Sequence, residues 1–257
     1  MELILFEPMQ GYARIRLNRP QKRNAMSAQL RAELRTAMKL AREHFHVLIL
    51  TGVDDIFCGG IDLKEVQSEA AQGSQAALSD WRELSAEIRE HPSIFIAAVN
   101  GLALGGGVTL TGVCDLAIAS DDALFGLPEV GFGMYPNPAG PAAQLSLSRK
   151  RAAWMVLTAE RISAAQAQAW GLINEVVPRA QLDQRTETIA TRIAQFDAAT
   201  LSACKRALDD IPLMVNNWRD AFSAGVSAND AIAASSSHAA HALELFTQGE
   251  RNTGQGQ

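Results

Sequence analysis

The chain has 257 residues, of which 47% are hydrophobic and 20% are charged, and its formal net charge is −5. A chain of this length can bury a full hydrophobic core as one large domain, alone or with a small appendage. No basic stripe is present, which argues against a nucleic-acid partner, and no apolar run approaches the ~18 residues that a membrane span needs.

The cysteines are few and widely spaced, at Cys58, Cys114 and Cys204. They form no Cys-x-x-Cys pair, so neither a disulfide framework nor a zinc site is indicated, and we expect no metal. A cytoplasmic protein is the default expectation for such a chain. Residues 1–6 show no basic segment followed by a long apolar core, so we expect no secretory signal.

The first fifth of the chain predicts a hairpin, a helix and a buried strand. Residues 3–6 and 12–17 alternate apolar and polar side chains around Gly11, which favours a β-hairpin. Ser27 is placed to cap a helix that runs to about His44, because apolar residues follow it at helical spacing. The short apolar run at residues 47–50 is typical of a buried strand.

The next segment contains the first unusual glycine pair. Within residues 56–66, Gly59 and Gly60 come just after a predicted strand and just before a predicted helix. Residues 68–79 are rich in alanine, glutamine and serine, and we expect them to be mobile. Residues 81–89 predict a helix.

A second glycine-rich junction follows the apolar strand predicted at residues 94–99. Gly105, Gly106 and Gly107 open a segment that can be helical. Glycine has no β-carbon, so a backbone N–H can come close to a ligand there, and the start of a helix adds free N–H groups and a positive dipole end. The stretch alone allows two interpretations, a site for negative charge or a tight turn without a ligand.

The middle of the chain continues the alternation of strands and helices. Strands are predicted at residues 116–119 and 123–125, and residues 131–140, with three glycines and two prolines, are predicted to be an irregular apolar loop. Beyond this loop the pattern predicts helices at residues 149–157 and 164–170, the second capped by Ser163 and ended by Gly171, and a strand at residues 173–177.

From about residue 182 the pattern is helical almost to the end, with a break expected near Ile211 and Pro212 and a disordered tail after Gln248. Strand signals stop near residue 195. We therefore expect an α/β core over residues 1–195 and a helical region over residues 196–257. His238 and His241 share a face of a predicted late helix, and we expect a surface or subunit-interface role for them.

Four segments in order resemble the enoyl-CoA hydratase/isomerase (crotonase) superfamily. They are L-N-R-P-x-x-x-N-A at residues 17–25, F-C-G-G-I-D-L-K-E at residues 57–65, N-G-x-A-x-G-G-G-x-x-L-x-x-x-C-D ending at Asp115, and F-G-L-P-E-V-G-F-G at residues 125–133. The resemblance implies a spiral of ββα units with two nearly perpendicular sheets. It also implies a C-terminal helical region that assembles trimers or hexamers, and an acyl-CoA or acyl-carrier thioester as substrate without a separate cofactor.

The shared chemistry of that superfamily is stabilisation of a thioester enolate by two backbone N–H groups. The resemblance assigns these donors to Gly59 and Gly106, and each donor of this kind contributes roughly 2.7–4 kcal/mol. Glu129 matches one of the two glutamates of the hydratases, and a carboxylate among apolar residues suits a proton shuttle. Thr109 stands where hydratases usually carry the other glutamate, and threonine cannot act as a base near pH 7.

The resemblance also suggests residues for substrate binding. Gly60, Ile61 and Leu63 are candidates for main-chain contacts with the adenine, and Arg23 is a candidate for the CoA phosphates, although a solvated surface role stays open. Tyr135 is a candidate for the acyl pocket. Asn137 would orient a substrate, or would serve as a turn residue between two prolines. Asp62 and Asp115 are expected to be structural, the first as a helix cap.

Because one glutamate is present and the other is replaced, we expect double-bond isomerisation of an enoyl-CoA, with Glu129 removing and returning the proton. One alternative is an enoyl-CoA hydratase or dehydratase, including one that acts on carrier-bound polyketide intermediates. The other is a binding or scaffold protein that kept the fold and lost catalysis. The acyl chain itself is not determined by these patterns.

Overall fold

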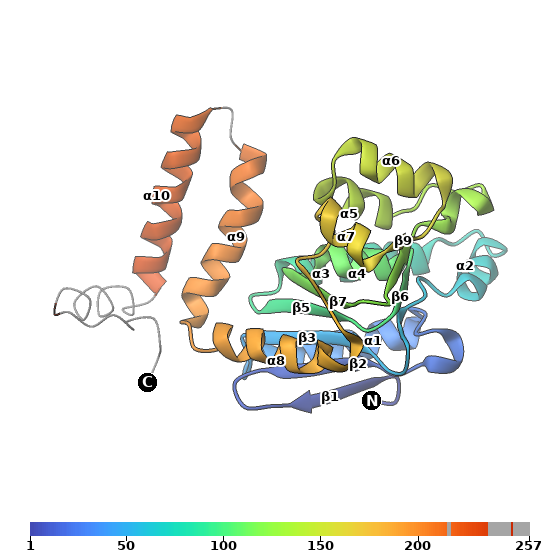
Figure 1. Ribbon diagram of the computed structural model, residues 1–257, viewed down its shortest axis with the longest axis horizontal. Helices are drawn as coiled ribbons and strands as arrows, with labels where there is room; N and C mark the ends of the chain where they lie inside the picture. Colours follow the sequence, from blue (N-terminus) through green and yellow to red (C-terminus); the bar gives the residue numbers. More distant parts are fainter. Residues whose placement is uncertain (215–216, 236–247, 249–257) are drawn as a thin grey trace.

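Two mixed β-sheets form the body of the computed structural model, which describes residues 1–214, 217–235 and Gln248 (Figure 1). The larger sheet has the order β1 (Ile4–Pro8), β2 (Ala13–Leu17), β3 (Val47–Gly52), β5 (Ile94–Val99), β7 (Leu116–Ser120) and β10 (Glu175–Val177). The smaller sheet has the order β4 (Ile56–Cys58), β6 (Leu102–Leu104), β8 (Leu124–Gly126) and β9 (Ile162–Ser163). The expected hairpin is present as the antiparallel pair of β1 and β2.

Consecutive strands alternate between the two sheets. In the pairs β3–β4, β5–β6 and β7–β8, the first strand joins the larger sheet and the second joins the smaller one. Each pair is followed by one or more helices, so the chain repeats a ββα unit. The α/β fold built from ββα units with two sheets, which the family resemblance implies, is therefore confirmed, and both sheets are mixed.

The strands β3 and β5 are buried along their whole length. In β3, Val47 and Ile49 pack in the cluster under α8 (Leu182–Ile193), while Leu48 and Leu50 pack in the main core on the other face. A parallel strand that is covered on both faces needs apolar residues at every position. This explains the uninterrupted apolar runs at residues 47–50 of β3 and 94–99 of β5.

The helices of the core follow the predicted spacing closely. The first, α1 (Ala28–Arg42), begins after Ser27, whose side chain accepts a hydrogen bond from the Leu30 N–H. The other helices and 3₁₀ turns of the core are η1 (Pro20–Lys22), α2 (Leu63–Ala70), α3 (Ala76–Glu90), α4 (Gly106–Val113), η2 (Pro128–Phe132), α5 (Ala139–Ser146), α6 (Arg149–Thr158), α7 (Ala164–Trp170) and η3 (Arg179–Gln181). Ser163 and Gln166 form the capping box of α7, and Gly171 ends that helix in a left-handed conformation, as predicted.

The last described helices, α9 (Ala198–Met214) and α10 (Trp218–Ser235), pack against each other and stand away from the two sheets (Figure 1). The buried Lys205 joins α9 to the core, because its ammonium lies 3.0 Å from both the Ser93 carbonyl and the Asp115 carboxylate. Among the described helices, none combines the length and the apolar character that crossing a membrane requires.

Three sequence expectations need correction. Residues 68–79, expected to be mobile, lie mostly in α2 and α3, which leave only residues 71–75 between them. Residues 131–140 are irregular only in part, because η2 occupies the start and α5 begins at Ala139. The break expected near Pro212 is displaced, since α9 continues through that proline to Met214. His238 and His241, and the tail after Gln248, lie outside the described residues.

Candidate active site

The two glycine-rich junctions meet at the carboxyl ends of neighbouring strands. Strands β4 and β6 pair in parallel, so the segments that follow them emerge at the same edge of the smaller sheet. The contact is close: a β-carbon on Gly106 would stand 3.1 Å from the Gly60 Cα and 3.3 Å from the Ile61 nitrogen. Glycine at position 106 is what lets these two backbones approach.

Two free backbone N–H groups face this junction. Gly106 is the first residue of α4, and the N–H of a first helical residue has no acceptor within its own helix. The Ile61 N–H donates no hydrogen bond within the part of the chain that the structure describes. A small anionic atom between the two segments would meet both donors and the positive end of the α4 dipole.

Gly59, the first predicted oxyanion donor, is not free to play that role. Its N–H donates to the Arg23 carbonyl at 2.7 Å, so its hydrogen bond is made inside the protein. A β-carbon on Gly59 would also stand 2.9 Å from that carbonyl oxygen. This glycine permits a backbone contact between two loops, and the structure corrects the prediction that it binds a ligand oxygen.

The Arg23 carbonyl is held there by its own loop. Arg23 and Asn24 both have left-handed backbone conformations, with φ of 54° and 52°. The Asn24 side chain is fully buried, accepts from the Arg19 N–H at 2.9 Å and donates to the Ile56 carbonyl at 2.7 Å. The L-N-R-P-x-x-x-N-A segment thus fixes β4 and the junction that follows it.

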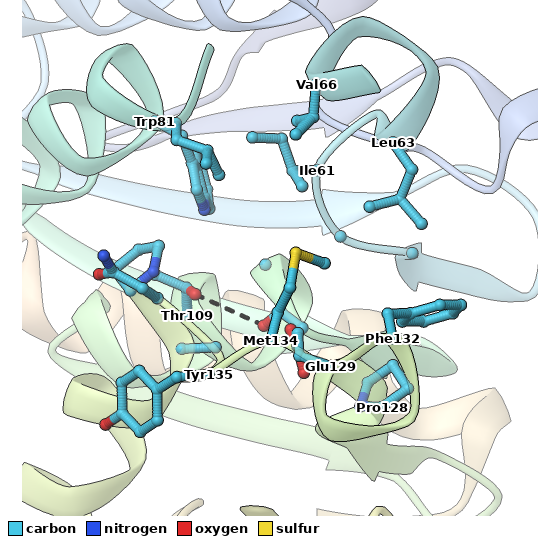
Figure 2. A pocket seen from close by; sticks show the side chains of 18 residues that line it. Ile61, Leu63, Val66, Trp81, Thr109, Pro128, Glu129, Phe132, Met134 and Tyr135 are labelled. Carbon is cyan, nitrogen blue, oxygen red and sulfur yellow. Dashed lines mark hydrogen bonds between the residues drawn. The ribbon is translucent and has the colours of Figure 1, made fainter. Parts of the chain in front are cut away.

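A cavity of about 120 Å³ opens beside the two free donors. Figure 2 shows its two walls: Ile61, Leu63, Val66 and Trp81 lie on one side, and Thr109, Glu129, Phe132, Met134 and Tyr135 lie on the other. The remaining lining residues are Gly59, Gly60, Leu78, Gly105, Gly106, Pro128, Asn137, Pro138 and Ala139. Most of these side chains are apolar, so a ligand here would be largely desolvated.

Glu129 is the one carboxylate among the described residues that line this cavity. It lies in the first turn of η2, and its Oε2 is buried without a hydrogen-bond partner in the described part of the protein. Burial raises the pKa of Glu129, because the charged form is poorly solvated. A carboxyl group with one unpartnered oxygen and a raised pKa suits proton transfer to and from a ligand.

Thr109 is fully buried and points its hydroxyl back to its own helix. Its Oγ1 lies 3.4 Å from the Gly105 carbonyl, one turn earlier in α4. This long hydrogen bond leaves the hydroxyl able to bond a ligand or a water molecule as well. The side chain cannot replace a second carboxylate as a base.

Five of the other predicted binding residues line the cavity, and the sixth, Arg23, does not. The five are Gly60, Ile61, Leu63, Tyr135 and Asn137. The Tyr135 hydroxyl accepts a hydrogen bond from the Gln144 side chain at 2.7 Å and lies over Gly140.

Arg23 is exposed and lies outside the cavity, next to Gly59.

The two acidic residues that we expected to be structural make hydrogen bonds and ion pairs within the protein. Asp62 caps α2 and pairs with Arg19 at 2.7 Å, and Asp115 accepts from the Phe95 N–H at 2.8 Å.

Sequence reasoning missed two lining side chains, Val66 on α2 and Trp81 on α3. Helical spacing indicated that Trp81 is in a helix, but not which neighbour that helix faces. The free N–H of Ile61 was missed because glycine was taken as the mark of a donor. A free N–H is the physical requirement, and glycine at position 60, with φ of 105°, shapes the turn that presents the next N–H.

Comparison with known proteins agrees with these features. The family model described as enoyl-CoA hydratase/isomerase matches residues 7–248. The 2,3-dehydroadipyl-CoA hydratase of Escherichia coli is 34% identical over 212 residues, which cover 81% of this chain and 82% of that protein. The mevalonyl-coenzyme A hydratase of Aspergillus fumigatus is 38% identical over 183 residues, covering 70% of this chain and 67% of that protein.

Solved structures show the same architecture. The human enoyl coenzyme A hydratase domain-containing protein 3 superposes with a TM-score of 0.89 at 28% identity, covering 97% of this chain and 98% of that one. An enoyl-CoA hydratase from Bacillus anthracis gives a TM-score of 0.88 at 28% identity, with 96% of both chains covered. These similarities extend over the two sheets and the helices that follow them.

Proposed function

Because the chain belongs to the enoyl-CoA hydratase/isomerase family, we propose that it converts an enoyl thioester of coenzyme A through an enolate-like transition state. One observation carries this proposal: a carboxylate whose Oε2 is buried without a partner and two free backbone N–H groups in the described part of the chain converge on one apolar cavity. The donors suit a thioester oxygen that becomes negative, and the carboxylate suits the proton that must move at the same time.

The oxyanion donors in this proposal are the N–H groups of Ile61 and Gly106. They belong to segments that touch, since a β-carbon on Gly106 would come 3.3 Å from the Ile61 nitrogen. Donors that are fixed by the backbone need no reorganisation during the reaction, and each contributes roughly 2.7–4 kcal/mol where negative charge develops. The donors are therefore Gly106, as the sequence predicted, and Ile61 in place of Gly59.

Hydration of a 2-enoyl-CoA is the reaction we favour. In this reaction a water molecule held by Glu129 attacks the β-carbon of the thioester, and its proton passes to the carboxylate. The electron pair of the Cα=Cβ bond forms a double bond from Cα to the carbonyl carbon, and the carbonyl electron pair moves onto the thioester oxygen, at the two N–H groups. Glu129 then delivers the proton to the α-carbon, so one carboxyl group serves as base and as acid. The hydratase names of the relatives support this choice.

Isomerisation of a 3-enoyl-CoA is the second candidate. The observation that favours it is that Thr109 occupies the place of the second hydratase glutamate, so Glu129 stands alone in the cavity. Here Glu129 removes a proton from the α-carbon and returns it to the γ-carbon, and no water takes part. The same oxyanion donors serve both reactions, and the two reactions differ in whether water takes part.

The deciding experiment compares two substrates of the purified protein. A 2-enoyl-CoA that loses its conjugated-thioester absorbance, with formation of the 3-hydroxyacyl-CoA by mass spectrometry, supports hydration. A 3-enoyl-CoA that gains this absorbance, while the 2-enoyl-CoA stays unchanged, would replace hydration by isomerisation. Turnover of neither, with or without CoA binding, would contradict both enzymatic assignments and favour a carrier-bound substrate or a non-catalytic role.

We also propose that α9 and α10 join copies of this chain. This proposal is supported by large apolar side chains that are exposed on these helices: Leu208, Leu213 and Val226. Exposed apolar surface of this kind is typical of interfaces between subunits. Light scattering coupled to size exclusion should give a trimer or hexamer. A monomer at micromolar concentration would contradict this proposal without touching the proposed reaction.

A further inference from the structure

The indole N–H of Trp81 is a hydrogen-bond donor in the cavity that the proposed reaction does not use. It lies on α3, is only 1% exposed, and lines the cavity wall opposite Glu129. Figure 2 shows its indole extending from α3 toward the wall that carries Thr109, with the ring nitrogen at the leading edge. The indole N–H is therefore directed into the space where the substrate would lie.

This N–H has no acceptor in the described part of the protein. Thr109, on the opposite wall, directs its own hydroxyl to the Gly105 carbonyl, and the Tyr135 oxygen accepts from Gln144. Buried tryptophan N–H groups usually have a partner, because an unsatisfied donor loses its bond to water without gaining another. Where this N–H reaches the cavity, water can accept its hydrogen bond until a ligand displaces that water, and the ligand then has to supply the acceptor.

The charge of the cavity restricts the kind of acceptor. Among its described lining residues none is a lysine or arginine, and Glu129 is the one ionisable carboxyl group. A substrate carboxylate placed here would be buried without a counter-charge and would share the cavity with a second acidic group, which is costly. A neutral oxygen needs only one donor, and the indole N–H supplies one.

We propose that Trp81 selects acyl groups that carry a neutral oxygen, a hydroxyl or a carbonyl, beyond the reacting double bond. The proposal rests on the assignment of an enoyl thioester of coenzyme A as substrate. The indole donates one hydrogen bond to that oxygen, and an acyl chain without the oxygen leaves the donor unsatisfied. Trp81 is then a specificity residue, and it takes no part in proton transfer.

Binding of unreactive thioesters tests this selection without any turnover. Hexanoyl-CoA is compared by titration calorimetry with its 4-, 5- and 6-hydroxy derivatives and with adipyl-CoA, which ends in a carboxylate. The wild type should bind one hydroxy derivative roughly five- to tenfold more tightly than hexanoyl-CoA, the ratio that one net hydrogen bond provides. Adipyl-CoA should bind more weakly than that derivative.

The variant Trp81→Phe should bind the hydroxy derivative and hexanoyl-CoA equally, since it keeps an aromatic ring and lacks the N–H. Trp170→Phe is the matched control, because Trp170 lies on α7 outside the cavity and should leave the ratio unchanged. Equal affinity of the wild type for all thioesters, which would mean that a water molecule satisfies the indole, would overturn the proposal even if Trp81→Phe fails to fold. A preference that survives Trp81→Phe, or a preference for adipyl-CoA, would also overturn it.

Turnover separates this proposal from the proposed reaction. If the hydroxy thioester binds preferentially through Trp81 but no 2-enoyl or 3-enoyl thioester is converted, the reaction is wrong and the selection stands. If 2-hexenoyl-CoA and its hydroxy derivatives are converted with the same kcat/KM, the reaction stands and the selection is wrong.

Discussion

The carboxylate of Glu129 lies directly over Gly105, so that a β-carbon at position 105 would stand 2.5 Å from Oε1. Gly105 also has φ of 49°, a conformation that other residues rarely adopt. The first glycine of the triplet therefore makes room for the Glu129 carboxylate, and the second provides a free N–H. One glycine run thus positions both halves of the proposed chemistry.

Replacing Glu129 by Gln should lower kcat/KM for the converted thioester by a factor of at least about 100, the usual contribution of general acid–base catalysis. Glutamine keeps the size of the side chain but cannot accept a proton. The exposed carboxyl of Glu160, which lies outside the cavity, gives the control Glu160→Gln, expected to retain wild-type activity. Steady-state rates at pH 7 measure both, and full activity of Glu129→Gln would refute the proton-transfer role.

The raised pKa of Glu129 should also appear in the stability of the protein. Because the folded state favours the protonated carboxyl, the unfolded chain releases this proton at a lower pH than the folded chain does, so the free energy of unfolding falls as pH rises from the ordinary glutamate pKa to the raised one. Glu129→Gln does not ionise, so it should be more stable than the wild type at neutral pH and similar to it near pH 4. Urea denaturation at several pH values measures this difference. A variant that is less stable at pH 7 would contradict the burial of an ionisable carboxyl.

Gly106→Ala should reduce kcat/KM by roughly 10- to 100-fold, because small displacements of reacting groups have effects of this size. Its new β-carbon would stand 3.1 Å from the Gly60 Cα and would push the two donor segments apart. Gly131→Ala is the matched control, since a β-carbon there meets no atom within 4 Å. Kinetics with melting temperatures would separate a local effect from unfolding; equal activity of both variants would contradict the paired-donor geometry.

His91 should make the protein sensitive to mild acid. Its ring is buried, Nδ1 accepts from the Ser93 N–H at 3.1 Å, and burial lowers the pKa of His91 to about 4. As pH falls from 6.5 toward 4 the unfolded chain binds a proton that the folded chain does not, so stability falls by up to roughly 3 kcal/mol. His91→Gln should show a smaller loss between pH 7 and pH 4 in urea denaturation. The same pH dependence in both proteins would contradict the assignment.

Much of the local structure could be predicted because its causes are local. Ser27 caps α1 through an N–H three residues away, and residues 47–50 are all apolar with two β-branched side chains, a pattern that favours a buried strand by itself. The break expected at Pro212 was misplaced, because α9 continues through that proline. Local chemistry disfavours a proline inside a helix. The helix can tolerate it when other contacts hold the helix in place, and here Lys205 is one such contact with the core.

Some features of the site could likewise be predicted from residue types at fixed spacing, and others depend on the tertiary structure. The sequence by itself determined the family, the two glycine-rich junctions and the proposed proton-transfer residue, since these are carried by residue types at fixed spacing. Only the tertiary structure decided which N–H groups are free. The Gly59 N–H is occupied by the carbonyl of Arg23, a residue distant in the chain. Trp81 lines the cavity because α3, the helix that carries it, packs beside the site. Hydrogen-bond partners and cavity walls depend on which distant segments meet, and no local pattern encodes that meeting.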